Sequence, residues 1–535
     1  MKKKSISIFS VIVLLIGFCI VFSIARRPEQ SDDNTRYEQH EVKMAEGADP
    51  SLGITGFKDG DYSVDPDFVS HLPLVVIDLE GNKIPDAYAF DKSSGRFVLK
   101  EGVDPYVGGK ISVIDNASNV NTLSDQPSEE SDIQIKYRGN SSVIYNKHQF
   151  RIKLQNQDGE NNPLDIMGMG ADSDWILNIS MIDASLVRNY MAMNIAGQIM
   201  PYVPDVRYCE VIMKDGDHYV YQGLYLMMES VKAGDNRVDI SKYKSKHNYT
   251  SYLVRRDRYD EEDTMLNTYA TQNKLCYGYL ALRYPSGDDV NAKVINYVTD
   301  DISKTEKVLF SNDKNEFMKY KQYIDEDSFV DYFLINEYFA NYDAGNNSTY
   351  MYKDVGGKLT IGPVWDYDND LDNIGKYMLD PETISFEGQA WFPQLLQSES
   401  FCKKLISRYQ ELRKTVLSDE YINNYVDQVS AYLGNAQKRD WSRWNDEYTK
   451  ERFDVLEDKD GIPVDRNLTT FDENTQKVKD ICNEHAEYIL PQLQKLLSEC
   501  KYKAAYNTYT EYGIAFIVLL LSVIVIVRRR GEMKG

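Results

Sequence analysis

Cysteine and histidine, which often carry zinc or redox chemistry, are scarce: the 535-residue chain has six of each. No Cys-x-x-Cys pair occurs and the histidines are not clustered, which argues against a zinc site, a thioredoxin-type centre and a histidine-based metal site. Cys19 lies in an apolar run, and the other five cysteines leave at least one thiol unpaired. Cys482 and Cys500 are candidates for a disulfide, a pairing that the sequence leaves open.

The two common glycine motifs for phosphate are also missing. The chain has no Gly-x₄-Gly-Lys-Ser/Thr segment, which excludes a P-loop, and no Gly-x-Gly-x-x-Gly segment after a strand. Any phosphate chemistry must therefore use a different arrangement of residues.

Positive charge is in deficit. The formal net charge is −22, and because the two basic ends contribute +8, residues 28–527 carry −30. Such a field repels nucleic acid and anionic lipid and attracts basic proteins, so we expect no nucleic-acid partner. Solubility of a secreted surface explains the charge equally well. With 42% hydrophobic residues, the middle of the chain has the composition of a folded protein.

Two apolar runs flank this acidic middle. Residues 5–25 and 511–527 are each long enough to cross a bilayer, and Lys2–Lys4 and Arg528–Arg530 mark their outer flanks. Positive charge favours the cytoplasmic side, which predicts a two-pass cell-membrane protein that contacts lipid through both spans, with its main domain extracytoplasmic. The predicted divisions are a tip and N-terminal anchor (1–27), a polar spacer (28–70), a domain with two lobes (about 71–230 and 231–500), a C-terminal span (510–528) and a basic tail (529–535).

The apolar pattern between the spans predicts strands first and helices later, which indicates an α+β fold with two lobes. Helical patterns dominate after about residue 290, apart from a β segment at 348–364. The predicted strands are Leu74–Ile77, Ile111–Ile114, Ile133–Tyr137 and Gln149–Leu154, with a hairpin of Val211–Met213 and Tyr219–Met228; Leu186–Ile199 has helical spacing.

The densest acidic segment is Gly362–Asp372, which follows a strand-like piece. We expect Asp366 and Asp368 to bind Mg²⁺, which needs one or two carboxylates and leaves positions for phosphate oxygens. The alternatives are a solvated acidic turn and a calcium loop. An EF-hand is a poor match, because Leu371 and Tyr377 replace its glycine and its final glutamate.

Two further segments carry polar side chains suited to phosphoryl transfer. Asp343 follows a predicted helix, where its carboxylate can accept a hydroxyl proton, and Asn347 can hold a metal. Arg138–Ser142 reads Arg-Gly-Asn-Ser-Ser, followed by Lys147 and by Lys153 on a strand; glycine lets backbone amides approach phosphate, and arginine offers two donors. An ordinary turn and an ordinary hairpin are the alternatives.

Taken together, these segments resemble the CotH family of atypical kinases over roughly residues 72–400. The resemblance rests on the order of the motifs: RGNSS (138–142), Lys147, the strand of Lys153, DASLVRNY (183–190), GLYLMME (223–229), YFLINE (332–337), Asp343, Asn347 and GKLTIGPVWDYD (357–368). It implies a kinase-like fold that binds ATP with Mg²⁺, Mn²⁺ or Ca²⁺ and phosphorylates protein serine or threonine.

The resemblance also implies roles. Asp343 resembles the catalytic aspartate, Lys153 the strand lysine that contacts nucleotide phosphates, and Asp366 the metal ligand. The other implied positions are Arg138, Ser141 and Lys147 by the phosphates, Met228 and Glu229 in a hinge-like segment near the adenine, and Asn347 and Asp368 by the metal. There is no HRD or DFG motif; the corresponding segments read NYD (341–343) and WDYD (365–368), and no glutamate is evident to pair with Lys153.

The expected function is therefore a membrane-anchored CotH-type kinase acting on a basic, serine-rich protein. Because ATP is scarce outside cells, an outward-facing domain needs an unusual donor or an enclosed compartment, such as that around a forming spore; otherwise the domain is cytoplasmic. The alternative function is a non-catalytic surface or spore-coat assembly protein whose acidic loop binds calcium or a partner.

Overall fold

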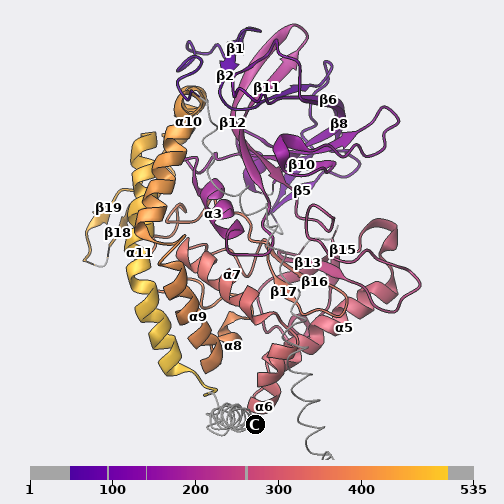
Figure 1. Cartoon of the computed structure of the whole chain (residues 1–535), viewed down its shortest axis with the longest axis vertical. Coiled ribbons are helices and arrows are strands. Elements are labelled where there is room, and N and C mark those ends of the chain that lie inside the picture. The colour runs from indigo at the N-terminus through magenta and orange to yellow at the C-terminus, as the bar shows by residue number, and fades with distance from the viewer. Residues whose placement is uncertain (1–48, 93–95, 140, 260–262, 459, 504–535) are drawn as a thin grey trace, which may run out of the picture.

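The computed structural model of the chain describes residues 49–92, 96–139, 141–259, 263–458 and 460–503 (Figure 1). In these ranges no helix is both long enough and apolar enough to cross a bilayer. Both predicted spans, 5–25 and 511–527, lie outside the described residues, as do residues 28–48 of the predicted spacer.

The first lobe is built on an eight-stranded sheet. Its strands are β1 (Ser63–Val64), β3 (Leu74–Asp78), β6 (Val107–Ile114), β8 (Glu129–Arg138), β9 (Gln149–Gln155), β10 (Asp174–Asn178), β11 (Val206–Asp215) and β12 (His218–Glu229). The order is β1-β12-β10-β9-β8-β6-β3-β11, and β12 also pairs with β11, so seven strands close into a ring. Neighbours are antiparallel except for β3 and β11. Closure leaves few free edges and gives the lobe an enclosed apolar interior.

Short elements surround this ring. They are β2 (Val69–Ser70) paired with β7 (Asn121–Thr122), β4 (Tyr88–Asp91) paired with β5 (Arg96–Leu99), the 3₁₀ turns η1 (Ser141–Ile144) and η2 (Ile166–Gly168), and helix α3 (Arg188–Gly197). Every residue of α3 is buried. This helix therefore lies inside the molecule, between the ring and the second lobe.

The second lobe combines a five-stranded antiparallel sheet with helices. The sheet order is β14 (Thr264–Leu266), β15 (Tyr279–Tyr284), β13 (Tyr252–Asp257), β16 (Thr349–Lys353) and β17 (Thr360–Ile361). The helices are α4 (Tyr269–Gln272), α5 (Ala292–Leu309), α6 (Lys314–Phe317), α7 (Glu326–Tyr338), α8 (Phe392–Leu395), α9 (Glu399–Leu412), α10 (Asp419–Tyr448) and α11 (Phe471–Glu499), with the turns η3 (Gly287–Asp289) and η4 (Met318–Gln322) and a ribbon of β18 (Leu456–Glu457) and β19 (Pro463–Val464).

The pattern-based predictions of secondary structure are largely confirmed. All four predicted strands appear as β3, β6, β8 and β9, the hairpin appears as β11 and β12, and helices do follow residue 290. In β8 the alternation buries Ile133 and Ile135 while their neighbours stay half-exposed. The mixed α/β architecture agrees with the expected fold class, and the strands β13 and β15 are additions that the sequence pattern did not reveal.

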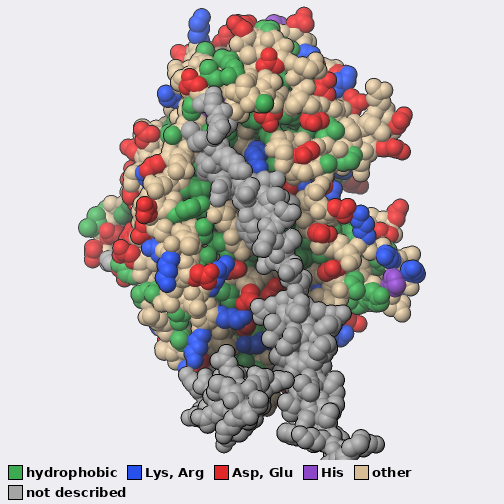
Figure 2. Space-filling view, viewed as in Figure 1, with side chains coloured by type: hydrophobic (Ala, Val, Ile, Leu, Met, Phe, Trp, Pro, Cys, Tyr) green, Lys and Arg blue, Asp and Glu red, His purple; other side chains and the backbone are tan. Residues whose placement is uncertain are grey.

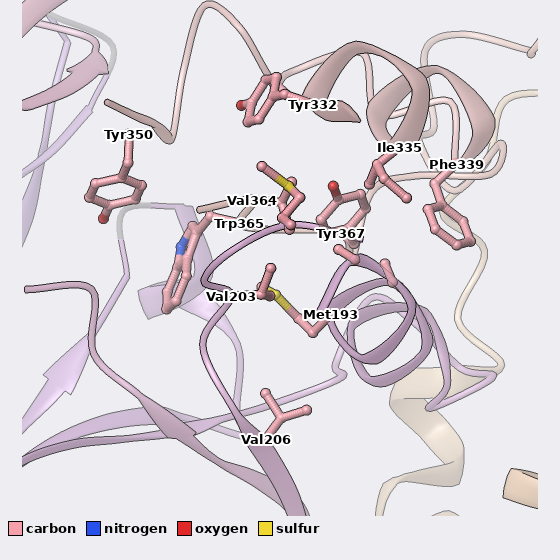
Figure 3. Close-up of a cluster of buried hydrophobic side chains, with 14 of the residues drawn as sticks. Met193, Val203, Val206, Tyr332, Ile335, Phe339, Tyr350, Val364, Trp365 and Tyr367 are labelled. Carbon is pink, nitrogen blue, oxygen red and sulfur yellow. The ribbon is translucent and has the colours of Figure 1, made fainter. Parts of the chain in front are cut away.

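One continuous apolar core joins the two lobes. Figure 3 shows its centre, where Met193 on α3 and Ile335 on α7 lie on either side of the segment carrying Val364 and Tyr367. The loop that follows β17 is therefore anchored in the core on both sides.

Helix α10 leaves its own lobe and packs on the first one. It runs beside α11 along one edge of the molecule and reaches the level of β1, β2 and β12 (Figure 1). Arg439 on α10 makes a two-pronged ion pair with Glu210 on β11, through Nε (2.8 Å) and Nη2 (2.6 Å), and both side chains are fully buried. A late segment of the chain thus completes the first lobe.

The same helix corrects the predicted spacer. Residues 49–70, assigned by composition to the polar segment 28–70, are built into the domain instead. The Asn435 backbone N–H donates to the Pro50 carbonyl (2.7 Å), and Arg439 Nη1 donates to the carbonyls of Leu52 and Ile54 (both 3.0 Å). A polar, extended segment can be fixed in this way because its backbone carbonyls supply the contacts.

Helix α11 rules out the Cys482–Cys500 disulfide. It begins at a capping box of Thr470 and Glu473, and Cys500 is its C-cap. Eighteen residues along one helix separate the two thiols by about 27 Å, far beyond disulfide reach.

Candidate functional site

The site begins at Asp366, in the loop after β17. Trp365 and Tyr367 are buried in the core (Figure 3). Asp366 between them is exposed, so its aromatic neighbours fix the loop and the carboxylate reaches solvent. Asp366 has φ of +70°, a left-handed conformation that costs most residues free energy. Such strain persists only where the surroundings hold the backbone in place.

Two asparagines hold this strained loop. Asn341 Nδ2, just after α7, donates to the Asp366 carbonyl (3.1 Å), and its Oδ1 accepts from the Ala344 N–H (3.2 Å). On the other side the Tyr367 N–H donates to Asn189 Oδ1 on α3 (2.8 Å). The 341–347 segment and the acidic loop, 25 positions apart in the first of these bonds, are therefore parts of one structure.

The 341–347 segment places Asp343 beside Asn347. Asn347 Nδ2 donates to Asp343 Oδ1 (2.6 Å), and the Asn347 N–H donates to the Asp343 carbonyl (3.0 Å). Arg258, just after β13, lies with its Nη2 4.0 Å from the same Oδ1. Sequence reasoning missed Arg258, since no pattern in the sequence links it to a residue 85 positions later.

The carboxylates of this cluster act on one another. Crowding by protein atoms raises the pKa of Asp366, the Arg138 guanidinium lowers it and Asp343 raises it, and the net shift is upward. Asp366 nevertheless keeps contact with solvent. Burial and then the Asp366 carboxylate raise the pKa of Asp368 well above its usual range. The arrangement places negatively charged carboxylates close together, and a bound cation would reduce the repulsion between them.

The residues present fit a divalent cation. Asn347 is 6% exposed, and its Oδ1 accepts no hydrogen bond, which leaves a buried acceptor on the side chain that binds Asp343, whose carboxylate in turn acts on Asp366. Across the described ranges no group of three or more His, Cys, Asp or Glu side chains is placed to hold a metal ion. A cation here would therefore take part of its coordination from elsewhere, as Mg²⁺ does when it binds through one or two carboxylates plus phosphate oxygens.

Opposite the acidic loops, the first lobe presents basic side chains. At the end of β8, Arg138 donates from Nη1 to Gln149 Oε1 (2.9 Å), and its guanidinium carbon lies 5.3 Å from the centre of the Trp365 ring. Lys153 on β9 lies over the Tyr106 ring (4.6 Å) and faces no carboxylate at ion-pair distance among the described residues. Of the two, Arg138 lies close enough to Asp366 to act on its charge, whereas no contact among the described residues joins Lys153 to the acidic cluster.

Arg151 is a further basic residue of this group that the sequence reading overlooked. Its Nε donates to Asp174 Oδ1 (3.0 Å). Strand alternation supplies the signal that would have found it, because Arg151 lies two positions before Lys153 and shares its face of β9.

Not every predicted residue reaches the site. Lys147 is fully buried and donates to Asp440 Oδ1 on α10 (2.7 Å), so this lysine cannot contact phosphate as expected. Met228 and Glu229 are also buried, and Glu229 Oε1 accepts from Arg237 Nη1 (2.6 Å). The backbone of Ser141 opens η1, but its side chain lies outside what the structure describes.

The DASLVRNY segment supports the acidic loop from below. Arg188, at the start of α3, donates from Nη1 to Asp183 Oδ1 (2.5 Å) and from Nε to the Asp370 carbonyl (3.2 Å). It is fully buried. The segment therefore positions the loop rather than pairing with Lys153, in agreement with the missing glutamate.

A groove of about 440 Å³ adjoins the cluster on the Asp368 side. It lies between η1, residues 369–375 and the end of α10, and its lining includes Tyr145, Asn369, Glu447, Lys450 and Arg452. Away from the groove, acidic side chains are spread over both lobes on the face shown in Figure 2, as the net charge requires.

Comparison with known proteins supplies one match. The family model described as "CotH kinase protein" matches residues 135–489, about two thirds of the chain. The matched range includes every residue of the acidic cluster as well as Arg138 and Lys153. No curated protein matches the sequence.

Proposed function

Because the chain belongs to the CotH family of kinase proteins, we propose that it transfers the γ-phosphoryl group of ATP to a serine or threonine hydroxyl of a protein. The observation that carries the proposal is the convergence of Asp343, Asn347, Asp366 and Asp368 on one side of the site, opposite Arg138 on the other. Phosphoryl transfer needs positioning and charge neutralisation more than covalent chemistry by the protein.

Asp343 serves as the proton acceptor. As the hydroxyl oxygen bonds to the γ-phosphorus and the bond to the β-phosphate oxygen breaks, the hydroxyl proton passes to the Asp343 carboxylate and ADP leaves. Asn347 Nδ2 occupies Oδ1 of that carboxylate at 2.6 Å and fixes its orientation. The second carboxylate oxygen then faces the acceptor hydroxyl.

Asp366, Asp368 and Asn347 Oδ1 would hold Mg²⁺ or Mn²⁺. A bound cation would neutralise the charge of the phosphate oxygens, which is its usual contribution to this reaction. Anchoring of the loop by Trp365 and Tyr367 keeps both carboxylates in place before ligands arrive. The strained φ of Asp366 therefore serves preorganisation.

The basic residues of the first lobe would receive the phosphates of the nucleotide. Arg138 lies within electrostatic reach of Asp366, and among the described residues the Lys153 ammonium contacts the Tyr106 ring and no carboxylate. A lysine that leaves an aromatic ring to bind a phosphate loses little interaction free energy, because an exposed cation–π contact contributes about 0.5–1 kcal/mol. Lys153 thus remains the candidate for the phosphate-contacting lysine.

A basic, serine-rich protein is the proposed acceptor, and the cell membrane is the proposed location, with two spans and the domain outside. The acidic surface of both lobes favours a basic partner. The spans rest on the two apolar runs and their flanking charges.

The test uses the full-length protein with labelled ATP, Mg²⁺ or Mn²⁺ and a basic serine-rich protein. We expect transfer by the wild type and a loss of at least about 100-fold in Asp366→Ala and in Asp343→Ala. Glu387→Gln, an exposed change in the same lobe, is the matched control and should retain full activity. Equal labelling by Asp366→Ala and wild type would remove the metal assignment.

Nucleotide binding separates the kinase from the alternative function. A surface or coat protein that uses its acidic loop for calcium or a partner would bind no ATP in the presence of Mg²⁺. Calorimetric titration of the wild type with ATP and Mg²⁺, and separately with Ca²⁺, distinguishes the two functions directly.

A further inference from the structure

Two thiols that the proposed function does not use lie where α9 meets the end of α11. Cys402 on α9 and Cys500, the C-cap of α11, lie with their Sγ atoms 3.3 Å apart. Both are buried, at 1% and 6% exposure. The two residues are 98 positions apart in sequence, so their contact is a product of the fold.

Backbone contacts hold the two segments in register. Ser398 and Tyr502 form a parallel bridge, in which the Glu399 N–H donates to the Tyr502 carbonyl (3.1 Å) and the Tyr502 N–H donates to the Gln397 carbonyl (2.8 Å). This bridge fixes the chain on the far side of Cys500 from α11. The cysteine is therefore constrained from both directions.

Both thiols lie near one backbone acceptor, and Cys500 Sγ also lies 3.3 Å from the Leu496 carbonyl oxygen. The Sγ atoms of Cys402 and Cys500 lie 3.3 Å and 3.4 Å from the Leu396 carbonyl oxygen. A disulfide bond of about 2.05 Å would bring the sulfurs about 1.3 Å closer, within the range of small side-chain and backbone adjustments. It would also remove two weak donors that share one buried acceptor.

We propose that Cys402 and Cys500 form an intramolecular disulfide when the folding chain meets a thiol–disulfide oxidant. The two thiols lose two electrons and two protons, and the disulfide of the oxidant takes them up to become two thiols. The remaining three cysteines of the described chain, Cys209, Cys276 and Cys482, show no such sulfur neighbour. The proposal does not depend on kinase activity.

Burial determines when the bond forms. Burial raises the pKa of both thiols, which keeps the attacking thiolate scarce once the domain is closed. Oxidation is therefore faster before the last turn of α11 settles against α9, and an oxidising compartment, such as the predicted extracytoplasmic side, favours it.

The bond would sit where the chain leaves the domain. After Tyr502 the sequence runs on toward the predicted C-terminal span. A covalent link between α9 and the end of α11 would hold the segment before the predicted span on the domain. It would also keep the C-terminal end of α11 from separating from α9 when that segment is pulled.

Peptide mapping tests the proposal. Reduced full-length protein is incubated with oxidised glutathione under conditions that allow α11 to fray, then alkylated and digested with trypsin without reduction. We expect the peptides 377–403 and 496–501 to appear joined, lighter by two hydrogen atoms than the two free peptides together, and to separate on reduction. The oxidised protein should melt about 3 °C higher than the reduced protein.

Cys500→Ala and Cys482→Ala are the matched variants, both on α11. Cys500→Ala should abolish the joined peptide and the oxidant-dependent rise in melting temperature, while Cys482→Ala should keep both. Wild-type protein whose Cys402 and Cys500 remain fully alkylated after oxidation would overturn the proposal, as would a joined peptide that contains Cys482. Both readouts are independent of phosphate transfer, so failure here leaves the kinase proposal standing, and the reverse also holds.

Discussion

Two places in this molecule concentrate buried or crowded charge, and they handle it in opposite ways. Where α10 meets the first lobe, each acid has a base: Arg439 pairs with Glu210, and Lys147 pairs with Asp440. In the acidic cluster, Asp366 and Asp368 are neighbours, and the Asn347 amide oxygen lacks a donor.

The difference indicates what each place is for. In a completed ion pair no charged group is left free to bind a ligand, and the pair instead determines which two segments of the chain pack together. At the first site Asp440 Oδ1 also accepts the Leu224 N–H (2.7 Å), and Gly223 leaves room for it: a Cβ there would lie 2.5 Å from that oxygen. Crowded carboxylates at the second site cost stability in the free protein, and under the proposed function a bound cation and phosphates would recover that stability.

The largest expected effect is a loss of stability on removing one partner of the buried Lys147–Asp440 ion pair. Asp440→Ala leaves Lys147 buried without its partner, and we expect the free energy of unfolding to fall by about 3–5 kcal/mol. Urea denaturation followed by tryptophan fluorescence measures the loss. Asp446→Ala, exposed on the same helix, should change stability by less than about 0.5 kcal/mol.

A double variant sharpens this prediction. Lys147→Met together with Asp440→Leu removes both charges, and it should be clearly more stable than Asp440→Ala because no unpaired charge stays buried. If the urea midpoint of Asp440→Ala equalled that of the wild type, the Lys147–Asp440 ion pair would not stabilise the packing of α10 on the first lobe.

The next largest effect is expected in the acidic cluster, where a substitution should lower activity without lowering stability. Asp368→Asn removes one of two crowded carboxylates, so stability should stay unchanged or rise slightly, while phosphate transfer falls about 100-fold or more. Parallel measurement of labelled phosphate incorporation and of the melting temperature checks both halves. A variant that loses stability and activity together would contradict the contrast drawn between the two places.

The smallest expected effect concerns a third buried charge, at His485 on α11. Its Nδ1 faces the Pro381 carbonyl (2.9 Å) and its Nε2 faces the Glu337 carboxylate (3.0 Å), so both ring nitrogens face acceptors. Burial lowers the pKa of His485, but the hydrogen bond and charge of Glu337 outweigh it, and the net pKa is raised.

A raised pKa fixes the direction of the pH dependence. The folded protein holds this proton more tightly than the unfolded chain, so the stabilisation is fully present below about pH 6.5 and is lost as pH rises through the folded-state pKa. We expect a loss of about 1 kcal/mol toward alkaline pH. His485→Gln should flatten that part of the stability profile, whereas the exposed His218→Gln should leave it unchanged.

Periodicity and residue type made different parts of the molecule predictable. Alternation located β8 and β9, and with them Arg138 and Lys153, because strand register is a local property of the sequence. The acidic loop was recognisable from residue type alone. Its strain at Asp366 and its attachment to Asn341 were not, since they arise from contacts between distant segments.

Lys147 shows where sequence reasoning fails. It follows the Arg-Gly-Asn-Ser-Ser segment closely, as a phosphate-binding residue would, yet its partner Asp440 lies 293 positions later. No local pattern encodes that meeting. For the same reason composition assigned residues 49–70 to a spacer, although their carbonyls bind α10.

The position of Asp440 also bears on how the protein is made. During synthesis at about 5–20 residues per second, the strands of the first lobe emerge roughly 10–40 seconds before α10 does. In that interval Lys147 and Glu210 lack their ion-pair partners on α10, so closure of the ring of strands over them would bury charge without a counter-charge. The first lobe can therefore complete its fold only after α10 of the second lobe has been synthesised. A chain truncated before α10 should stay incompletely folded and be degraded by proteases instead of forming a smaller stable domain.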